Sequence, residues 1–135
     1  MAWCNTGLGS YQKWFVGNEL RDILLSNSAI TAQVNEHIYP LIAPEKTEGD
    51  FIIYMRRDYS KKLTKQGVYA DVAEVAFVAI SDNYDNALQL AAEIDNTLSG
   101  THILEGDVRV DVKLSTSSEI FDDNKYVETL VFTIE

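Results

Sequence analysis

The residue types that most often perform catalysis or bind metals are widely separated in this sequence. His37 and His102 have no second histidine or cysteine at ligand spacing nearby, and Cys4 is the only cysteine. The sequence contains no metalloprotease helix motif, phosphate-binding loop or serine-hydrolase elbow, and Gly7-Leu8-Gly9-Ser10 does not complete a dinucleotide-binding fingerprint. We therefore expect no catalytic residue, no bound metal and no cofactor, and we predict that the protein is not an enzyme.

Carboxylates are abundant, and two groups of them resemble sites. Asp107 and Asp111 share one side of an alternating segment, where Arg109 stands between them and Lys113 follows. Alternating charge of this kind is typical of the solvated face of a strand. Asp122-Asp123-Asn124 resembles the start of a calcium-binding loop, but no glycine or later glutamate has the required spacing. We interpret this segment as a turn.

One cluster of basic residues is distinctive. Five of the 11 lysines and arginines fall close together in the link between the second and third predicted strands: Arg56, Arg57, Lys61, Lys62 and Lys65. They could form a solvated hairpin loop whose lysines discourage edge-to-edge pairing. Alternatively, they could contact an acidic surface, including that of another copy of the chain. A third alternative is nucleic-acid binding, with Tyr59 among the basic residues.

The overall charge argues against nucleic acid as a partner. The chain has 21 acidic and 11 basic residues, a formal charge of -10, whereas affinity for nucleic acid depends largely on neutralising phosphates. The N-terminus has no signal-peptide pattern. The most apolar stretch, Val72 to Ile80, contains Glu74 and is far shorter than the roughly 20 residues of a membrane span. We predict a protein made without export, with no specific affinity for nucleic acid and no membrane contact.

Two segments have the apolar periodicity of helices. From Trp14 to Leu25 one stripe contains Val16, Leu20, Ile23 and Leu24. A second helix is expected between a capping segment at Ser81-Asp82-Asn83 and a stop at Ser99-Gly100. Its stripe is predicted to contain Tyr84, Ala87, Leu88, Ala91 and Leu98. Between the two helices, Ser28 is a potential cap for a short turn that carries Ile30 and Val34.

Five segments are predicted to be extended. The segment 37–44 contains both prolines, and Pro40 restricts it to a sheet edge or an irregular segment. Phe51–Met55 follows, and then Val68–Ile80, which is apolar on both alternating faces and should need cover on both sides. That strand could reach about 40 Å, so part of it is expected to project as an arm. In the last two predicted strands an apolar set of alternating residues is expected to face the core. This set is Val108, Val110, Val112 and Leu114 in the first strand, and Tyr126, Leu130, Phe132 and Ile134 in the second.

This order, α-β-β-β-α-β-β, predicts an α+β protein. We expect a mostly antiparallel sheet of four to five strands with two helices packed against it. Residues 1–12 are rich in turn formers and are expected to be a flexible lead-in. Residues 13–135 then form a single domain, which the length of 135 residues allows.

One segment carries a family resemblance. His37-Ile38-Tyr39-Pro40-Leu41-Ile42-Ala43-Pro44, followed by Phe51-Ile52-Ile53-Tyr54, resembles the small tail-completion proteins of tailed bacteriophages and prophages. That family is catalogued as a domain of unknown function and is similar in fold to tail-terminator and head-to-tail joining proteins. The resemblance covers residues 15–135. It departs at Asp50, where the family commonly has a proline.

The resemblance implies a structural role in a virion. Several subunits, six by analogy, would form a ring that stops growth of the tail tube at its head-proximal end. The implied partners are further copies of the chain, the tail-tube protein and the head connector or neck protein. The implied location is the virion, after assembly in the host bacterial cytoplasm. Because a ring uses contacts between different patches, the basic cluster would meet an acidic neighbour.

An alternative interpretation, from a different functional class, is that the chain is a small acidic monomeric binding module, such as an inhibitor or a nucleic-acid mimic. A mimic should present a contiguous acidic face and should not need to associate with itself. A ring subunit should instead carry complementary patches.

Overall fold

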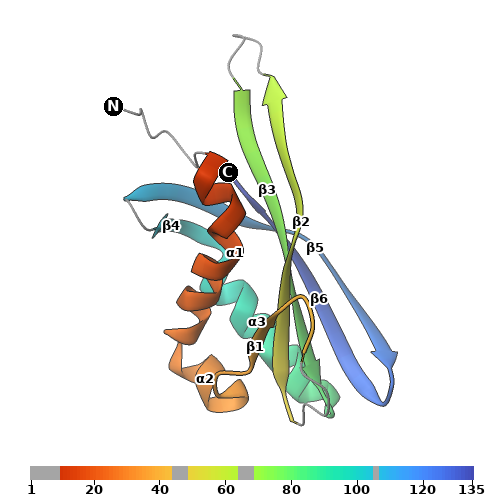
Figure 1. Ribbon diagram of the computed structural model, residues 1–135. Coiled ribbons are helices and arrows are strands. Elements are labelled where there is room, and N and C mark those ends of the chain that lie inside the picture. The colour runs from red at the N-terminus through yellow and green to blue at the C-terminus, as the bar shows by residue number, and fades with distance from the viewer. Residues whose placement is uncertain (1–9, 44–48, 64–68, 105–106) are drawn as a thin grey trace.

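The computed structural model describes residues 10–43, 49–63, 69–104 and 107–135, and only the backbone of residues 10–13, 58–63 and 69–71 (Figure 1). The helices are α1 (Ser10–Leu25), α2 (Ser28–Val34) and α3 (Tyr84–Leu98). The strands are β1 (Ile38–Pro40), β2 (Phe51–Leu63), β3 (Tyr69–Ser81), β4 (Gly100–Leu104), β5 (Val108–Asp122) and β6 (Lys125–Ile134).

The strands form one sheet in the order β1-β2-β3-β6-β5-β4. Every neighbouring pair is antiparallel except β1 and β2, which run parallel. The α+β class is confirmed, but the described residues form six strands and three helices where we expected four to five strands and two helices. The additional elements, α2 with 7 residues and β4 with 5, are too short to show a periodic apolar pattern.

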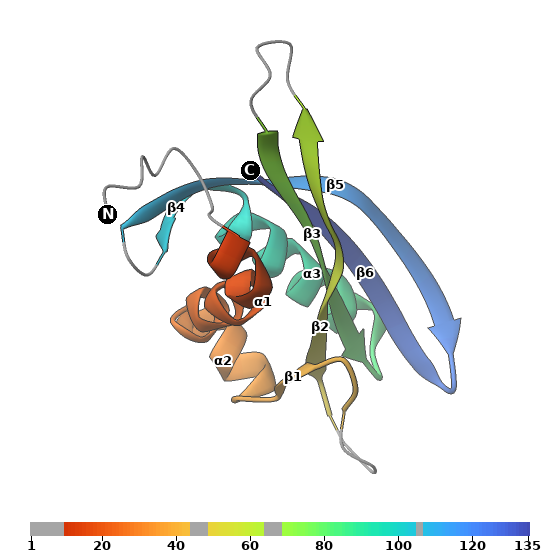
Figure 2. The same ribbon diagram turned by 45° about the horizontal axis from the view of Figure 1, so that its top comes forward.

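The helices pack against one face of the sheet (Figures 1 and 2). Val16, Leu20 and Leu24 of α1 are fully buried there, as the predicted stripe required. At Gly17 the helix approaches β2 closely, since a Cβ atom at this position would lie 3.3 Å from Cδ2 of Tyr54. Phe77 of β3 stacks on Tyr54 and meets the edge of Phe132, which joins three strands in one core.

The buried stripe of α3 differs from the predicted one. Ala87 and Leu98 are buried as expected, but the other core positions are Leu90 and Ile94. Leu88, which we placed in the stripe, is 40% exposed. The expected cap is present, because the Asn83 side chain accepts a hydrogen bond from the backbone N–H of Asn86 at 3.1 Å.

Asp50, the departure from the family pattern, connects three elements. Its carboxylate accepts hydrogen bonds from Ser81 Oγ at 2.6 Å and from Gln33 Nε2 at 2.7 Å. Ser81 is the last residue of β3 and is fully buried, and Gln33 lies in α2. A proline at this position could not make these bonds, so Asp50 fixes the start of β2 in a different way.

The hairpin of β2 and β3 projects beyond the rest of the sheet, as predicted (Figures 1 and 2). The two strands pair with each other out to Leu63 and Tyr69, whereas β6 pairs with β3 only from Ala73 onward. The prediction of a polar loop after Met55 was wrong up to Leu63, because these residues continue β2. Backbone pairing with the strongly β-forming β3 holds this polar segment extended.

The second face of β3 has no helical cover in the described part of the chain (Figure 2). Val72, Ala76 and Ile80 lie on this face and are buried, while Val78 is half-buried. Their neighbours across the sheet include Ile53, Met55 and Val131, so side chains of adjacent strands shield one another. The expected cover of the second face is therefore supplied by side chains of neighbouring strands and not by a helix of the described chain.

Candidate functional site

The basic cluster lies along one strand of the projecting hairpin. Arg56 is exposed, and its guanidinium carbon lies 4.1 Å from the ring centroid of Trp14 in α1. Such a cation–π contact holds Arg56 against the helical layer. Arg57 is also exposed, at a point where the pairing register of β2 shifts.

The remaining predicted residues lie further along the hairpin. The backbones of Lys61 and Lys62 belong to β2, opposite Asp71 and Ala70 of β3. Lys65 lies outside the described residues. The structure thus gathers Arg56, Arg57, Lys61 and Lys62 along β2.

Two long stretches of strand edge have no strand neighbour among the described residues. On one side of the sheet, β1 pairs only with residues 52–54 of β2, so the outer edge of 55–63 is open. On the other side, β4 pairs only with residues 108–112 of β5, so the outer edge of 113–122 is open. Open edges of this kind can pair with another chain.

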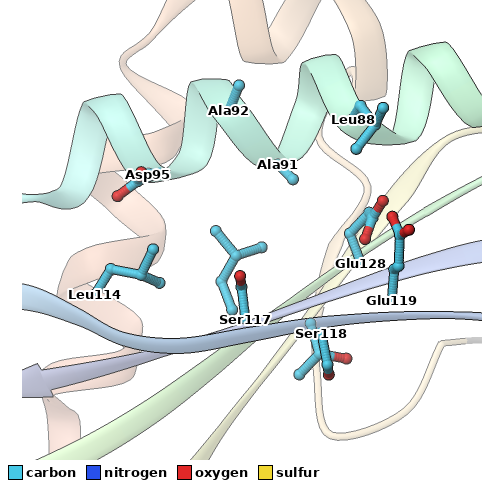
Figure 3. A pocket seen from close by; sticks show the side chains of 11 residues that line it. Leu88, Ala91, Ala92, Asp95, Leu114, Ser117, Ser118, Glu119 and Glu128 are labelled. Carbon is cyan, nitrogen blue, oxygen red and sulfur yellow. The ribbon is translucent and has the colours of Figure 1, made fainter.

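A groove lies between α3 and the open part of the sheet (Figure 3). Its volume is about 370 Å³, and its lining includes Leu88, Ala91, Asp95, Leu114, Glu119, Glu128 and Leu130. Leu114 was predicted to point into the core but is 37% exposed. Leu114 lies in the open groove beside α3, so the helix does not close over its side chain, and the register of β5 against β6 shifts directly after it.

Two glutamates face each other across β5 and β6 at the end of this groove (Figure 3). Glu128 is only 6% exposed, and its Oε1 atom is buried without a hydrogen-bond partner. Glu119 is exposed, and its two carboxylate oxygens accept from the hydroxyl of Tyr84 at 3.1 Å. Burial, together with the hydrogen bond and negative charge of Glu119, raises the pKa of Glu128 to about 7. The hydrogen bond to Glu119 also raises the pKa of Tyr84.

Sequence reasoning missed Glu128. It occupies an inward position of β6, in the same alternating set as Tyr126, Leu130 and Phe132. A charged residue within an otherwise apolar inward set is the signal that could have identified it.

The other residues considered at the outset are dispersed. His102 lies 2.7 Å from the carbonyl oxygen of Leu98, and the ring of His37 stacks near Tyr39. Asp111 is exposed and accepts a hydrogen bond from Thr101. The turn predicted at 122–124 is confirmed by the left-handed backbone of Asp123 and Asn124.

The described residues contain no group of three or more histidine, cysteine, aspartate or glutamate side chains that could hold a metal ion. Within the same ranges, no helix has the length and apolar character to cross a membrane.

The comparisons with known proteins identify the fold. No protein-family model matches the sequence, and no curated protein matches it. A chain from the virion of a native gene transfer agent particle has a TM-score of 0.74 and 18% identity, covering 88% of this chain and 92% of that one. A second solved protein has a TM-score of 0.58 and 13% identity, covering 93% and 96%. At these identities the likeness is one of fold.

Proposed function

We propose that this chain is a structural virion protein of a tailed phage or prophage, and not an enzyme. More specifically, we propose that it is a tail-completion or terminator subunit. A ring of subunits would cap the tail tube and join it to the head connector. The observation that carries the proposal is the shared fold with a chain of a gene transfer agent virion, a phage-like particle, over nearly the whole of both chains.

The surfaces of the chain support a role in assembly. The two open strand edges are features that a second chain would cover. The projecting hairpin of β2 and β3 extends past the sheet, where it can reach a neighbour (Figure 1). The proposed partners are further copies of the chain, by analogy six in a ring, the tail-tube protein and the head connector.

The first test is the molar mass in solution. Light scattering over a wide concentration range, at low and moderate salt, should show a discrete ring-sized oligomer that salt loosens. Negative-stain electron microscopy of the same sample should show rings. A protein that stays monomeric at every concentration and forms no rings would contradict the proposal and favour a monomeric acidic binding module.

The second test reverses charge on the basic strand. Lys61→Glu with Lys62→Glu should weaken association and leave the thermal midpoint nearly unchanged, because both positions lie in the part of the hairpin that extends beyond the pairing of β3 with β6. Lys61→Glu alone is compared with Arg109→Glu as a matched control, since Arg109 is exposed on the part of β5 that β4 pairs with. Equal effects of these two single substitutions would mean that net charge, and not the basic strand, governs association.

A further inference from the structure

The glutamate pair in the groove has no counterion among the side chains that the structure describes. Glu128 is more than nine-tenths buried, and its unpartnered Oε1 belongs to a carboxyl group directed into the groove beside Glu119 (Figure 3). Among the described residues, the other titratable groups around the groove are Asp95 and Tyr84 of α3 and Tyr126 of β6, and none is a cation. Two neighbouring carboxyl groups in such a place require either a shared proton or a bound cation.

The shape of the groove suits a long cationic side chain. Its walls include the apolar side chains of Leu88, Ala91 and Leu130, and the carboxyl groups lie at one end. Lysine and arginine combine an apolar stem with a charged head and bury the stem against apolar surface. The groove volume of about 370 Å³ is many times the roughly 30 Å³ that one water molecule occupies, so the groove has room for a long side chain.

The open edge of β5 lies beside the groove and includes Ser117, Ser118 and Glu119. An extended segment can pair with such an edge through its backbone and place alternate side chains in adjacent pockets. The chain carries its own extended, basic segment with an open edge, residues 55–63 of β2, on the opposite side of the sheet. This segment is basic and the groove is acidic, and both the segment and the part of β5 beside the groove have open strand edges. The segment of one copy is therefore suited to bind in the groove of a second copy.

We propose that the groove between α3 and the β5–β6 hairpin is a receptor for a lysine or arginine side chain, supplied by the basic stretch of β2 of a second copy. This inference rests on the self-association in the proposed function and names the contact that produces it. The contact joins two different surfaces, so each bound copy leaves one groove and one basic strand open for the next.

The test is a complementation experiment with full-length protein. One variant, Lys61→Glu/Lys62→Glu, keeps the groove and loses the basic strand. The other, Glu119→Gln/Glu128→Gln, keeps the basic strand and removes the charge of the groove. Each alone should associate at least about tenfold more weakly than the wild-type chain. An equimolar mixture should form heterodimers by light scattering, because one intact groove and one intact strand remain.

A control and a folding check complete the experiment. Glu36→Gln with Asp107→Asn removes the same charge from exposed positions outside the groove and should leave association unchanged. Circular dichroism and thermal unfolding should show that all variants are folded.

The outcomes separate this inference from the proposed function. If the wild-type chain associates and Glu119→Gln/Glu128→Gln associates equally well, the groove is not the receptor, although self-assembly stands. If both variants are monomeric but their mixture forms no heterodimer, the pairing of groove with β2 is wrong. If the wild-type chain does not associate at all, the proposed function fails and the inference fails with it.

Discussion

Replacing Glu128 with glutamine should stabilise the isolated subunit at neutral pH. In the folded chain the pKa of this carboxyl group is raised from 4.5 to about 7, mainly by burial and then by Glu119. The titratable groups around it in the described part of the chain are Glu119 on β5, Tyr84 and Asp95 on α3 and Tyr126 on β6, while Ala79 lies opposite on β3. Because the folded state binds the proton more tightly than the unfolded state, the free energy of unfolding should fall as pH rises from about 4.5 to 7.

The magnitude follows from the size of that shift. Each pKa unit corresponds to about 1.4 kcal/mol, so the penalty above pH 7 is at most about 3 kcal/mol. The groove is open to water at Glu119, which reduces the penalty, and we expect Glu128→Gln to gain about 1–2 kcal/mol at pH 8. At pH 4.5 and below, where the carboxyl group is protonated in the folded chain, the gain should be close to zero.

The assay is urea unfolding at pH 4.5, 6 and 8. All variants are compared in a chain that also carries Lys61→Glu/Lys62→Glu, so that association does not contribute to the free energy of unfolding. Glu36→Gln is the matched control, because it removes one carboxylate from an exposed position. Equal stability changes for the two substitutions at all three pH values, or a loss of stability for Glu128→Gln at pH 8, would refute the reasoning.

Three further experiments test the fold. Asn83→Ala removes the cap of α3 and should lower the free energy of unfolding by about 1 kcal/mol, measured by urea unfolding. Phe77→Ala creates a cavity between Tyr54 and Phe132 and should cost about 3–5 kcal/mol in the same assay, with a smaller loss contradicting its central place in the core. A double-mutant cycle of Arg56→Ala with Trp14→Ala should give a coupling energy of about 0.5–1 kcal/mol, and additivity would show that the two groups do not interact in solution.

The elements with long periodic patterns were predictable from the sequence, and the choice of buried face was less so. Helix α3 carries two overlapping apolar stripes, one through Leu88 and Ala91 and one through Leu90 and Ile94. Periodicity alone cannot choose between them. The choice is made by contacts with β3 and β6, which bury Leu90 and Ile94.

The polar ends of β2 and β5 were missed for a related reason. Tyr59 is the only β-branched or aromatic residue in 56–63, and Thr116 is the only one in 115–119, so each segment is extended because its neighbour, β3 or β6, is a strong strand. The β-propensity of a segment depends on its local sequence, whereas strand pairing depends on residues that are distant in the sequence. The same pairing produces the open strand edges on which the assembly proposal depends.

The glutamate pair could have been derived with one further step. A two-residue turn at Asp123 and Asn124 fixes the register of the hairpin around it, with Asp122 opposite Lys125. Counting outward from that turn places Glu119 opposite Glu128, as observed. The register does not show which of the two side chains is buried. That is decided by α3, which covers Glu128 and leaves Glu119 exposed at the edge.

The arrangement of charge also predicts the symmetry of association. The basic residues of β2 lie at one open edge of the sheet, and the carboxyl groups of the groove lie beside the other. A two-fold contact centred on one edge would place β2 against β2 or β5 against β5, and each would bring like charges together. Only a contact between unlike edges pairs opposite charges. Repetition of that contact gives a closed ring or an open filament, so a ring-sized limit to growth measured by light scattering would identify closure.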